Sequence, residues 1–273
     1  MDVRTIDSGR VPLTTYLREV WQARRLVLTF ARRDIQVKYA QSALGLFWVL
    51  LQPITGAVIF TVFFTALFDW GASGIEAPYF LFAFGGYTSW MFFSYIVQSA
   101  GSALLQEESL IKKVHFPKLI LPFAKSLVGL VDYAVSIVLL LVLALATGSL
   151  HWVGLWAMVP AVVLVGILGL SIAIWLSALT IRYRDFHHII PYIVNFGIWL
   201  TPIFFPTSFL RELVGDFIYI NPMAGAVDLF RWSILGTPFP SPWFAVSFVV
   251  SVVALVAGIR YFQRIEMLIA DYL

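Results

Sequence analysis

The chain has 273 residues, of which 60% are hydrophobic and 12% are charged. A soluble protein with this composition and a mean hydropathy of +0.89 would aggregate, whereas both values are ordinary for a protein that lies in a bilayer. The absence of cysteine from the sequence excludes disulfides, thiolate metal sites and a cysteine nucleophile. The net charge of +3 is small, so we interpret the basic residues as a topology signal and expect no nucleic-acid partner.

Residues 1–40 are predicted to form a cytoplasmic N-terminal region. From Leu13 to Tyr39, apolar residues recur at steps of three and four, and most of the arginines lie off that stripe. A basic amphipathic helix of this kind is typical of the cytoplasmic interface of a membrane, and the alternative is a helix that packs on a neighbouring domain. The segment lacks the apolar region of a cleavable signal peptide, so the first span is expected to act as its own insertion signal.

The rest of the chain consists mainly of long uncharged stretches. A hydrocarbon core of roughly 30 Å needs about 20 helical residues at about 1.5 Å each, and Gly148, His151 and Gly154 interrupt one stretch that is too long for a single span. Six spans are predicted, near residues 46–68, 79–100, 119–147, 155–180, 189–206 and 243–262. The fold class is therefore an all-α integral membrane protein, with a transmembrane domain over residues 41–266 and a cytoplasmic tail over residues 267–273.

The basic residues cluster in alternate gaps between the predicted spans. Eight lie in residues 1–38, four in the second gap with Lys125 included, two in the fourth gap and two in the tail, and only Arg211 and Arg231 fall elsewhere. Basic residues near membrane ends are retained in the cytoplasm. Both termini are therefore predicted to be cytoplasmic, in a protein of the inner (cytoplasmic) membrane.

The gap between the second and third spans is predicted to hold a short cytoplasmic helix over residues 104–114. Glu108 precedes Lys112 by four residues, which allows an ion pair on a helix, and Pro117 stops the turn. A short helix in this position can transmit force from a soluble partner. The alternative is a solvated charged loop.

The gap before the last span is unusually apolar for an outer loop. Asn221 followed by Pro222 is a helix start, because Asn caps a helix and Pro fits its first turn. Two half-length re-entrant helices over residues 208–236 are predicted, with Asp228 and Arg231 spaced to form a pair. A loop without fixed structure is the alternative.

Asp132 is the one acid deep in a predicted span, roughly 20 Å from the cytoplasmic end of its helix. Such a residue is a functional candidate, and a buried hydrogen bond to a neighbouring helix is the alternative. The sequence shows no basic intramembrane partner for it, since Lys125 lies nearer the inner surface and can extend toward it.

Catalytic and metal-binding patterns are mostly missing from the sequence. His187 and His188 are adjacent and, with His115 and His151, do not have the spacing of metal ligands. The sequence also lacks a GxxxxGK[ST] phosphate loop. We therefore expect no catalytic, metal or cofactor site, and any ATP-driven role requires an ATPase on another polypeptide.

Five ordered motifs are spread along the chain between residues 32 and 236. They are RRDIQVKYAQSALGLFWVLLQP (32–53), SLIKKVHFPKLILP (109–122), IRYRDFHHII (181–190), TPIFFP (201–206) and YINPMAGAVDLFRWSILG (219–236). Together they resemble the membrane subunit of ABC-2-type polysaccharide exporters, most closely those of lipid-linked O-antigen. Teichoic-acid exporters share the same plan, and capsular polysaccharide is a further alternative.

The resemblance implies a homodimer that binds two copies of an ATPase subunit, which carries the ATP and Mg²⁺, with a continuous polysaccharide channel between the two membrane subunits. The residues implied to couple the ATPase to the membrane are Leu104, Glu107, Glu108, Leu110, Ile111, Lys112, Lys113, Arg184 and Asp185. The first seven belong to the short cytoplasmic helix, and the last two to a smaller second contact. Asn221 and Pro222 would mark re-entrant elements at the outer mouth.

Aromatic rings can stack on the apolar faces of sugars and still allow sliding. The candidate channel residues are Trp48, Tyr87, Trp90, Phe93, Trp199 and Phe204, for which core packing is the alternative. Arg32, Arg33 and Lys38 are candidates for a lipid headgroup or pyrophosphate, or for binding to anionic membrane lipids.

Two functions of other classes remain alternatives. A secondary carrier would show internal repeats with broken helices in both halves, and no convincing repeat is visible. An integral membrane glycan-modifying enzyme would need clustered titratable groups at one membrane face, and residues 182–188 lack a nucleophile arrangement.

Overall fold

The computed structural model describes residues 12–40, 47–68 and 77–267, and within these ranges every regular element is a helix. Five helical segments are long and apolar enough to cross a membrane. They are α3 (Phe47–Phe68), α4 (Tyr79–Gly101), α7 (Ile120–Ala146), η1 (Trp152–Ala157) together with α8 (Met158–Arg182), and α12 (Phe244–Glu266). Their bounds lie within a few residues of five predicted spans. Residue 46, residues 1–11 and all of the predicted tail except Met267 lie outside the described residues.

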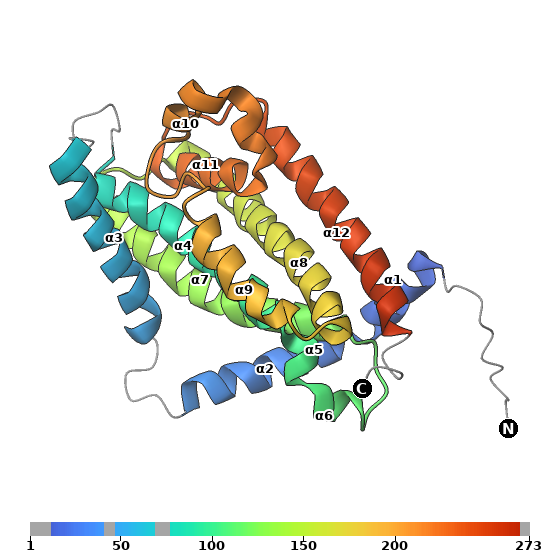
Figure 1. The fold of residues 1–273 in the computed structure, drawn as a ribbon. Coiled ribbons are helices and arrows are strands. Elements are labelled where there is room, and N and C mark those ends of the chain that lie inside the picture. Colours follow the sequence, from blue (N-terminus) through green and yellow to red (C-terminus); the bar gives the residue numbers. More distant parts are fainter. Residues whose placement is uncertain (1–11, 41–46, 69–76, 268–273) are drawn as a thin grey trace, which may run out of the picture.

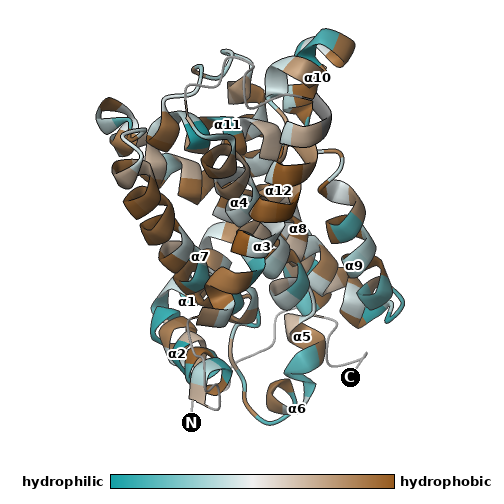
Figure 2. Ribbon diagram, turned by 90° about the vertical axis from the view of Figure 1, so that its left-hand side faces the viewer, coloured by the Kyte–Doolittle hydropathy of each residue, from teal (hydrophilic) through white to brown (hydrophobic). Residues whose placement is uncertain are grey.

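Apart from α9 (Phe186–Gly197), which runs alongside α4 and α8, the shorter helices lie at the two ends of this bundle (Figure 1). One end carries α1 (Leu13–Gln22), α2 (Arg24–Ala40), α5 (Ala103–Gln106) and α6 (Glu108–Ile111). The other end carries α10 (Thr207–Val214), η2 (Gly215–Ile220) and α11 (Pro222–Leu235). Figure 2 shows hydrophobic residues along the long helices and hydrophilic ones concentrated at α1, α2 and α6 and at α10. Helix α2, which contains five arginine and lysine residues, thus lies at the first of these ends.

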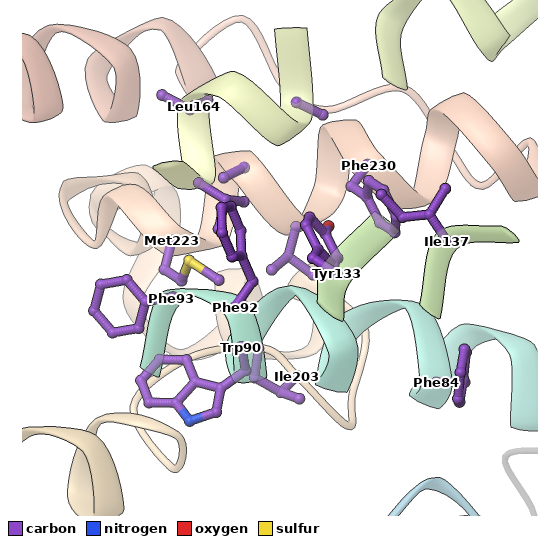
Figure 3. Packing of buried hydrophobic residues seen from close by; sticks show 14 of the residues in the cluster. Phe84, Trp90, Phe92, Phe93, Tyr133, Ile137, Leu164, Ile203, Met223 and Phe230 are labelled. Carbon is purple, nitrogen blue, oxygen red and sulfur yellow. The ribbon is translucent and has the colours of Figure 1, made fainter. Parts of the chain in front are cut away.

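Helix α4 is the centre of the bundle, with 78% of its most apolar window buried, against 11% for α3. It packs against α7, α8, α3 and α11. Close contact with α3 depends on Gly56, where a Cβ would lie 2.4 Å from the ring of Tyr87. Helix α4 contacts α7 through aromatic rings: Tyr133 of α7 stacks on Phe92 of α4, with ring centroids 4.8 Å apart. On its other side, Tyr133 contacts Phe230 of α11 (Figure 3).

The span predicted over residues 189–206 is wrong in extent. Helix α9 (Phe186–Gly197) has 12 residues, about 18 Å of helix, and falls short of the length needed to cross a membrane. The chain from Ile198 to Pro206 forms turns instead of helix. Pro202 and Pro206 interrupt helical hydrogen bonding there, and carbonyl groups in this stretch bind side chains of α11 and its cap.

Two predicted helices are each broken into two. The N-terminal helix is interrupted at Ala23, between α1 and α2, and the predicted coupling helix over residues 104–114 is interrupted at Glu107. The backbone of Glu107, with φ −103° and ψ 21°, leaves the helical region, so α5 and α6 are single turns rather than one helix. We refer to α5 and α6 as the helix pair.

Helices α10 and α11 with η2 form a bent unit before the last span. The axes on either side of Asn221 differ in direction by 108°. The Asn221 side chain accepts a hydrogen bond of 3.1 Å from the Met223 amide, and Pro222 occupies the first turn, which confirms the predicted helix start. Gly236 ends α11 with φ +65°, a left-handed conformation that favours glycine.

The packing around Gly86 gives a direct test of this fold. A Cβ at Gly86 would lie 2.2 Å from a guanidinium nitrogen of Arg231 and 2.6 Å from the Ile203 carbonyl oxygen, so Gly86→Ala should destabilise the protein by about 1–3 kcal/mol. Gly166→Ala is the matched control, because its Cβ would meet nothing nearer than Phe92 at 3.8 Å. Thermal aggregation in mild detergent measures the difference, and equal melting of the two variants would contradict the packing.

Candidate functional site

Four charged side chains meet where α2, the helix pair and α7 come together. The Arg33 guanidinium donates a hydrogen bond of 2.9 Å to Asp34 and binds Glu107 with two of its nitrogens, one at 3.3 Å. The Lys125 ammonium lies 2.8 Å from Asp34 and 3.8 Å from Glu107. Two cations therefore alternate with two carboxylates, and we call these four residues the charge cluster.

The charge cluster connects α2 to the helix pair and α7, which follow much later in the sequence; Arg33 and Glu107 are 74 positions apart. Burial raises the pKa of the Asp34 carboxyl, but the hydrogen bonds and charges of Lys125 and Arg33 outweigh burial, so this pKa lies below its ordinary value. Glu107 sits at the break between α5 and α6, and its side chain is only 15% exposed. Displacement of the helix pair must therefore move α2 and α7 with it or break these bonds.

Asp132 has a basic partner, contrary to the sequence-based expectation. Its carboxylate binds the Lys38 ammonium and accepts a hydrogen bond from the Tyr39 hydroxyl, both from the last turn of α2. Helix α2 packs along the first half of α7, so Asp34 meets Lys125 and Lys38 meets Asp132. Sequence spacing cannot show this pairing, because the partners are 94 positions apart.

A third polar contact fixes α1. The Glu266 carboxylate at the end of α12 accepts hydrogen bonds from the Tyr16 hydroxyl and, at 2.7 Å, from the Lys118 backbone amide. The first turn of α1, the chain after α6 and the end of α12 are thereby joined. Glu266 is not among the residues predicted from the sequence, where its only signal is an acid that follows Arg260 and Arg264 in the last helix.

The three basic residues predicted to bind a lipid headgroup or pyrophosphate differ in whether a carboxylate of the chain already binds them. Arg33 and Lys38 bind carboxylates of this chain, so a phosphate would have to compete with Glu107 or Asp132 for them. Arg32 is exposed and makes no ion pair with any residue that the structure describes. Of the three, Arg32 offers the most accessible charge.

The predicted coupling residues divide into a buried and an exposed group. Leu104 is fully buried and Ile111 is 9% exposed; both pack in a cluster with Phe116 and Ile120 and hold the helix pair against the bundle. Leu110 and Glu107 are partly buried. The exposed or partly exposed members are Glu108, Lys112, Lys113, Arg184 and Asp185. Glu108 and Lys112 form the expected pair at 2.7 Å, and Arg184 and Asp185 occupy the turn between α8 and α9.

The predicted channel aromatics divide in the same way. Trp90 and Phe93 are 4% exposed and Phe204 is 2% exposed, so these three rings lie in the protomer core, and Figure 3 shows the first two beside Phe92. Phe204 stacks on Phe60, and half-buried Tyr87 lies 5.6 Å from it. Trp48 and Trp199 are 56% and 61% exposed. Only these last two present most of their ring at the protomer surface.

Arg231 is the largest fully buried side chain among the described residues, and its spacing predicted only a pair with Asp228. The guanidinium instead donates to the carbonyls of Phe82, Pro202 and Ile203. Asp228 accepts hydrogen bonds from Thr207 at 2.6 Å and Tyr219 at 3.2 Å. The predicted direct pair is therefore wrong, and each charge is satisfied by other groups.

The geometry defines a polytopic helical membrane protein with a charged helix junction at one end, and within residues 12–40, 47–68 and 77–267 no three acidic or histidine side chains gather as metal ligands. The chain belongs to the ABC-2 type transporter family, whose model matches residues 25–235. This membership makes it a transporter component, and ABC-2 permeases in general work with an ABC ATPase.

Similar proteins share one description. An O-antigen export system permease protein RfbA of Myxococcus xanthus is 28% identical over 79% of this chain and 82% of its own length. Two proteins of the same name from Klebsiella pneumoniae are 21% and 22% identical, each over 91% of this chain and 95% of its own length. The similarity therefore extends over most of each protein.

Charge exchange tests the charge cluster. Arg33→Glu places a third carboxylate beside Asp34 and Glu107 and should lower stability, whereas adding Glu107→Arg restores the opposite charges and should recover about 0.5–3 kcal/mol. Glu108→Gln is the control, because its pair with Lys112 is screened by solvent and its loss should change the melting temperature little. Strictly additive melting shifts in the double variant would contradict the contact.

The pair of Lys38 on α2 with Asp132 on α7 gives a second test. Lys38→Met leaves the Asp132 carboxylate without its cation and should cost about 1–3 kcal/mol. Lys38→Met combined with Asp132→Leu removes both charges and should melt closer to the unmodified protein than Lys38→Met alone. A double variant less stable than both single variants would show that the two residues do not bind each other.

Proposed function

We propose that this chain is the permease subunit of an ATP-driven exporter that moves lipid-linked polysaccharide, of the O-antigen class, from the cytoplasm across the inner membrane. Family membership supports the transporter class, and the shared description of relatives that match most of the chain supports the substrate. The mechanism rests on the contacts of the helix pair, whose Glu107 binds Arg33 of α2 and lies 3.8 Å from the Lys125 ammonium of α7.

In the proposed assembly, two copies of the chain bind two ATPase subunits, which hold ATP and Mg²⁺. The end with α1, α2, α5 and α6 faces the cytoplasm, in accord with its basic residues. The ATPase contacts the exposed side of the helix pair around Lys113 and the turn at Arg184 and Asp185. Buried Leu104 and Ile111 connect that contact to the core, and the charge cluster passes the displacement to α2 and α7.

The polysaccharide path lies between the two copies. A long glycan cannot be enclosed in a midplane site, so a continuous channel is required. The exposed rings of Trp48 and Trp199 are available to line it, whereas Trp90, Phe93 and Phe204 are buried and pack in the core of each copy. At the opposite end, the bent unit of α10 and α11 forms the re-entrant outer mouth.

The glycan phenotype tests the export function. Cells from which the gene is deleted should lose surface polysaccharide and accumulate the lipid-linked glycan inside, and the unmodified chain should restore export. Separating intact cells from lysed cells before glycan blotting measures the two pools. An unchanged surface glycan in the deletion strain would contradict the proposal.

The ATPase contact is tested by reversing one exposed charge. Lys113→Glu should reduce copurification of the ATPase about tenfold, which corresponds to about 1.4 kcal/mol, without changing the melting temperature of the permease. Glu212→Lys is a matched control, since it reverses an exposed charge on α10 at the other end of the bundle. Equal ATPase recovery with both variants would place the contact elsewhere.

A further inference from the structure

A cleft of about 390 Å³ lies within one protomer, between the last turn of α2, the first turns of α3 and the middle of α4 and α7. This volume falls within the range of about 300–1,000 Å³ that is usual for small-molecule sites. The lining residues are Lys38, Tyr39, Trp48, Val49, Gln52, Pro53, Thr88, Met91, Phe92, Tyr95, Gly129, Asp132, Tyr133 and Ser136. We propose that this cleft is a binding subsite for an uncharged sugar ring of the exported glycan, an inference that rests on the proposed function.

The charge of the cleft excludes an anion as its preferred ligand. Lys38 and Asp132 are the only charged side chains among the lining residues, and they bind each other. A pyrophosphate would have to displace the Asp132 carboxylate from Lys38 and would leave that carboxylate without its cation and bound, among the described residues, only by the Tyr39 hydroxyl. A neutral ligand that forms hydrogen bonds can instead use the remaining acceptor and donor positions of the pair.

The aromatic walls of the cleft are held in place by the surrounding structure. The Tyr95 ring lies on Gly129, where a Cβ would come within 2.5 Å of it, and the Lys38 ammonium lies 4.6 Å from the ring centroid. Tyr39 is fixed by its hydrogen bond to Asp132. Across the cleft, Trp48 of α3 is 56% exposed. The accessible ring of Trp48 suits the C–H face of a sugar, which buries apolar area without needing charge.

Gln52 supplies an unused hydrogen-bonding group beside these rings. It is exposed, and its amide makes no hydrogen bond to any residue that the structure describes. An amide can donate and accept at once, which matches the paired hydroxyl groups of a sugar. Thr88 and Ser136, by contrast, already donate to backbone carbonyls of their own helices. Aromatic faces, a neutral ion pair and an available amide together favour a sugar over a lipid tail, which offers no hydrogen bonds.

Photo-crosslinking in cells that make the native surface polysaccharide tests the subsite. Gln52→p-benzoylphenylalanine should give a permease adduct that stains for carbohydrate and carries hexose by mass spectrometry. Val58 is the control position, because it is 44% exposed on the same helix and lies about 120° around the axis from Gln52. A carbohydrate adduct at least fivefold stronger at position 52 than at 58 supports the subsite. Equal or stronger labelling at 58, lipid without sugar, or no adduct at 52 overturns it.

A second measurement separates failure of the subsite from failure of the proposed function. Gln52→Leu should lower the rate at which glycan reaches the surface severalfold and leave ATPase assembly and melting unchanged, whereas Thr55→Val, at another exposed position of α3, should have no effect. Unimpaired export with Gln52→Leu overturns the subsite and leaves the export function standing. A deletion strain with normal surface glycan removes the export function itself.

Discussion

The structure depends on the need to satisfy polar groups inside a bundle that water does not reach. Where the chain from Ile198 to Pro206 leaves the helical path, its carbonyl groups lose their intrahelical partners, and the buried guanidinium of Arg231 binds two of them together with the Phe82 carbonyl. Gly86 leaves the space that this guanidinium occupies. Arg231 therefore links α11 both to α4 and to the chain after α9, with donors held in a fixed plane.

The same requirement organises the opposite end of the bundle. There the charges are balanced by alternating cations and carboxylates of α2, the helix pair and α7, and by Lys38 with Asp132 further along α7. Helix α2 is consequently a structural part of the bundle along its C-terminal half. A contact made on the exposed side of the helix pair reaches Asp132, and with it the cleft, through ionic and hydrogen bonds of α2.

Local patterns predicted much of this fold, because apolar length and capping depend on nearby residues. Five spans and the helix start at Asn221 followed from such patterns. The end of α9 did not, since it depends on carbonyl contacts with Arg231 and Asn221 from a later helix. The break at Glu107 also depends on tertiary partners, Arg33 and Lys125. The partner of Asp132 was missed because Lys38 lies in another helix, where spacing gives no information.

The candidate site was predictable in residue type more than in position. Basic and acidic residues near the membrane surface were identified, but their assignment to a headgroup did not account for the carboxylates that bind Arg33 and Lys38. Aromatic content likewise could not separate exposed Trp48 from buried Trp90, because both belong to equally apolar stretches. Burial decides these roles, and burial arises from how α3 and α4 pack together.

We propose that the chain transports only together with a separate ATPase. The mass and subunit composition of the intact complex, purified from native membranes in mild detergent, test this dependence. Two copies of this chain should be found with two copies of a protein that carries a phosphate-binding loop. A stable assembly of this chain alone, competent to export glycan after reconstitution in liposomes, would contradict the proposal.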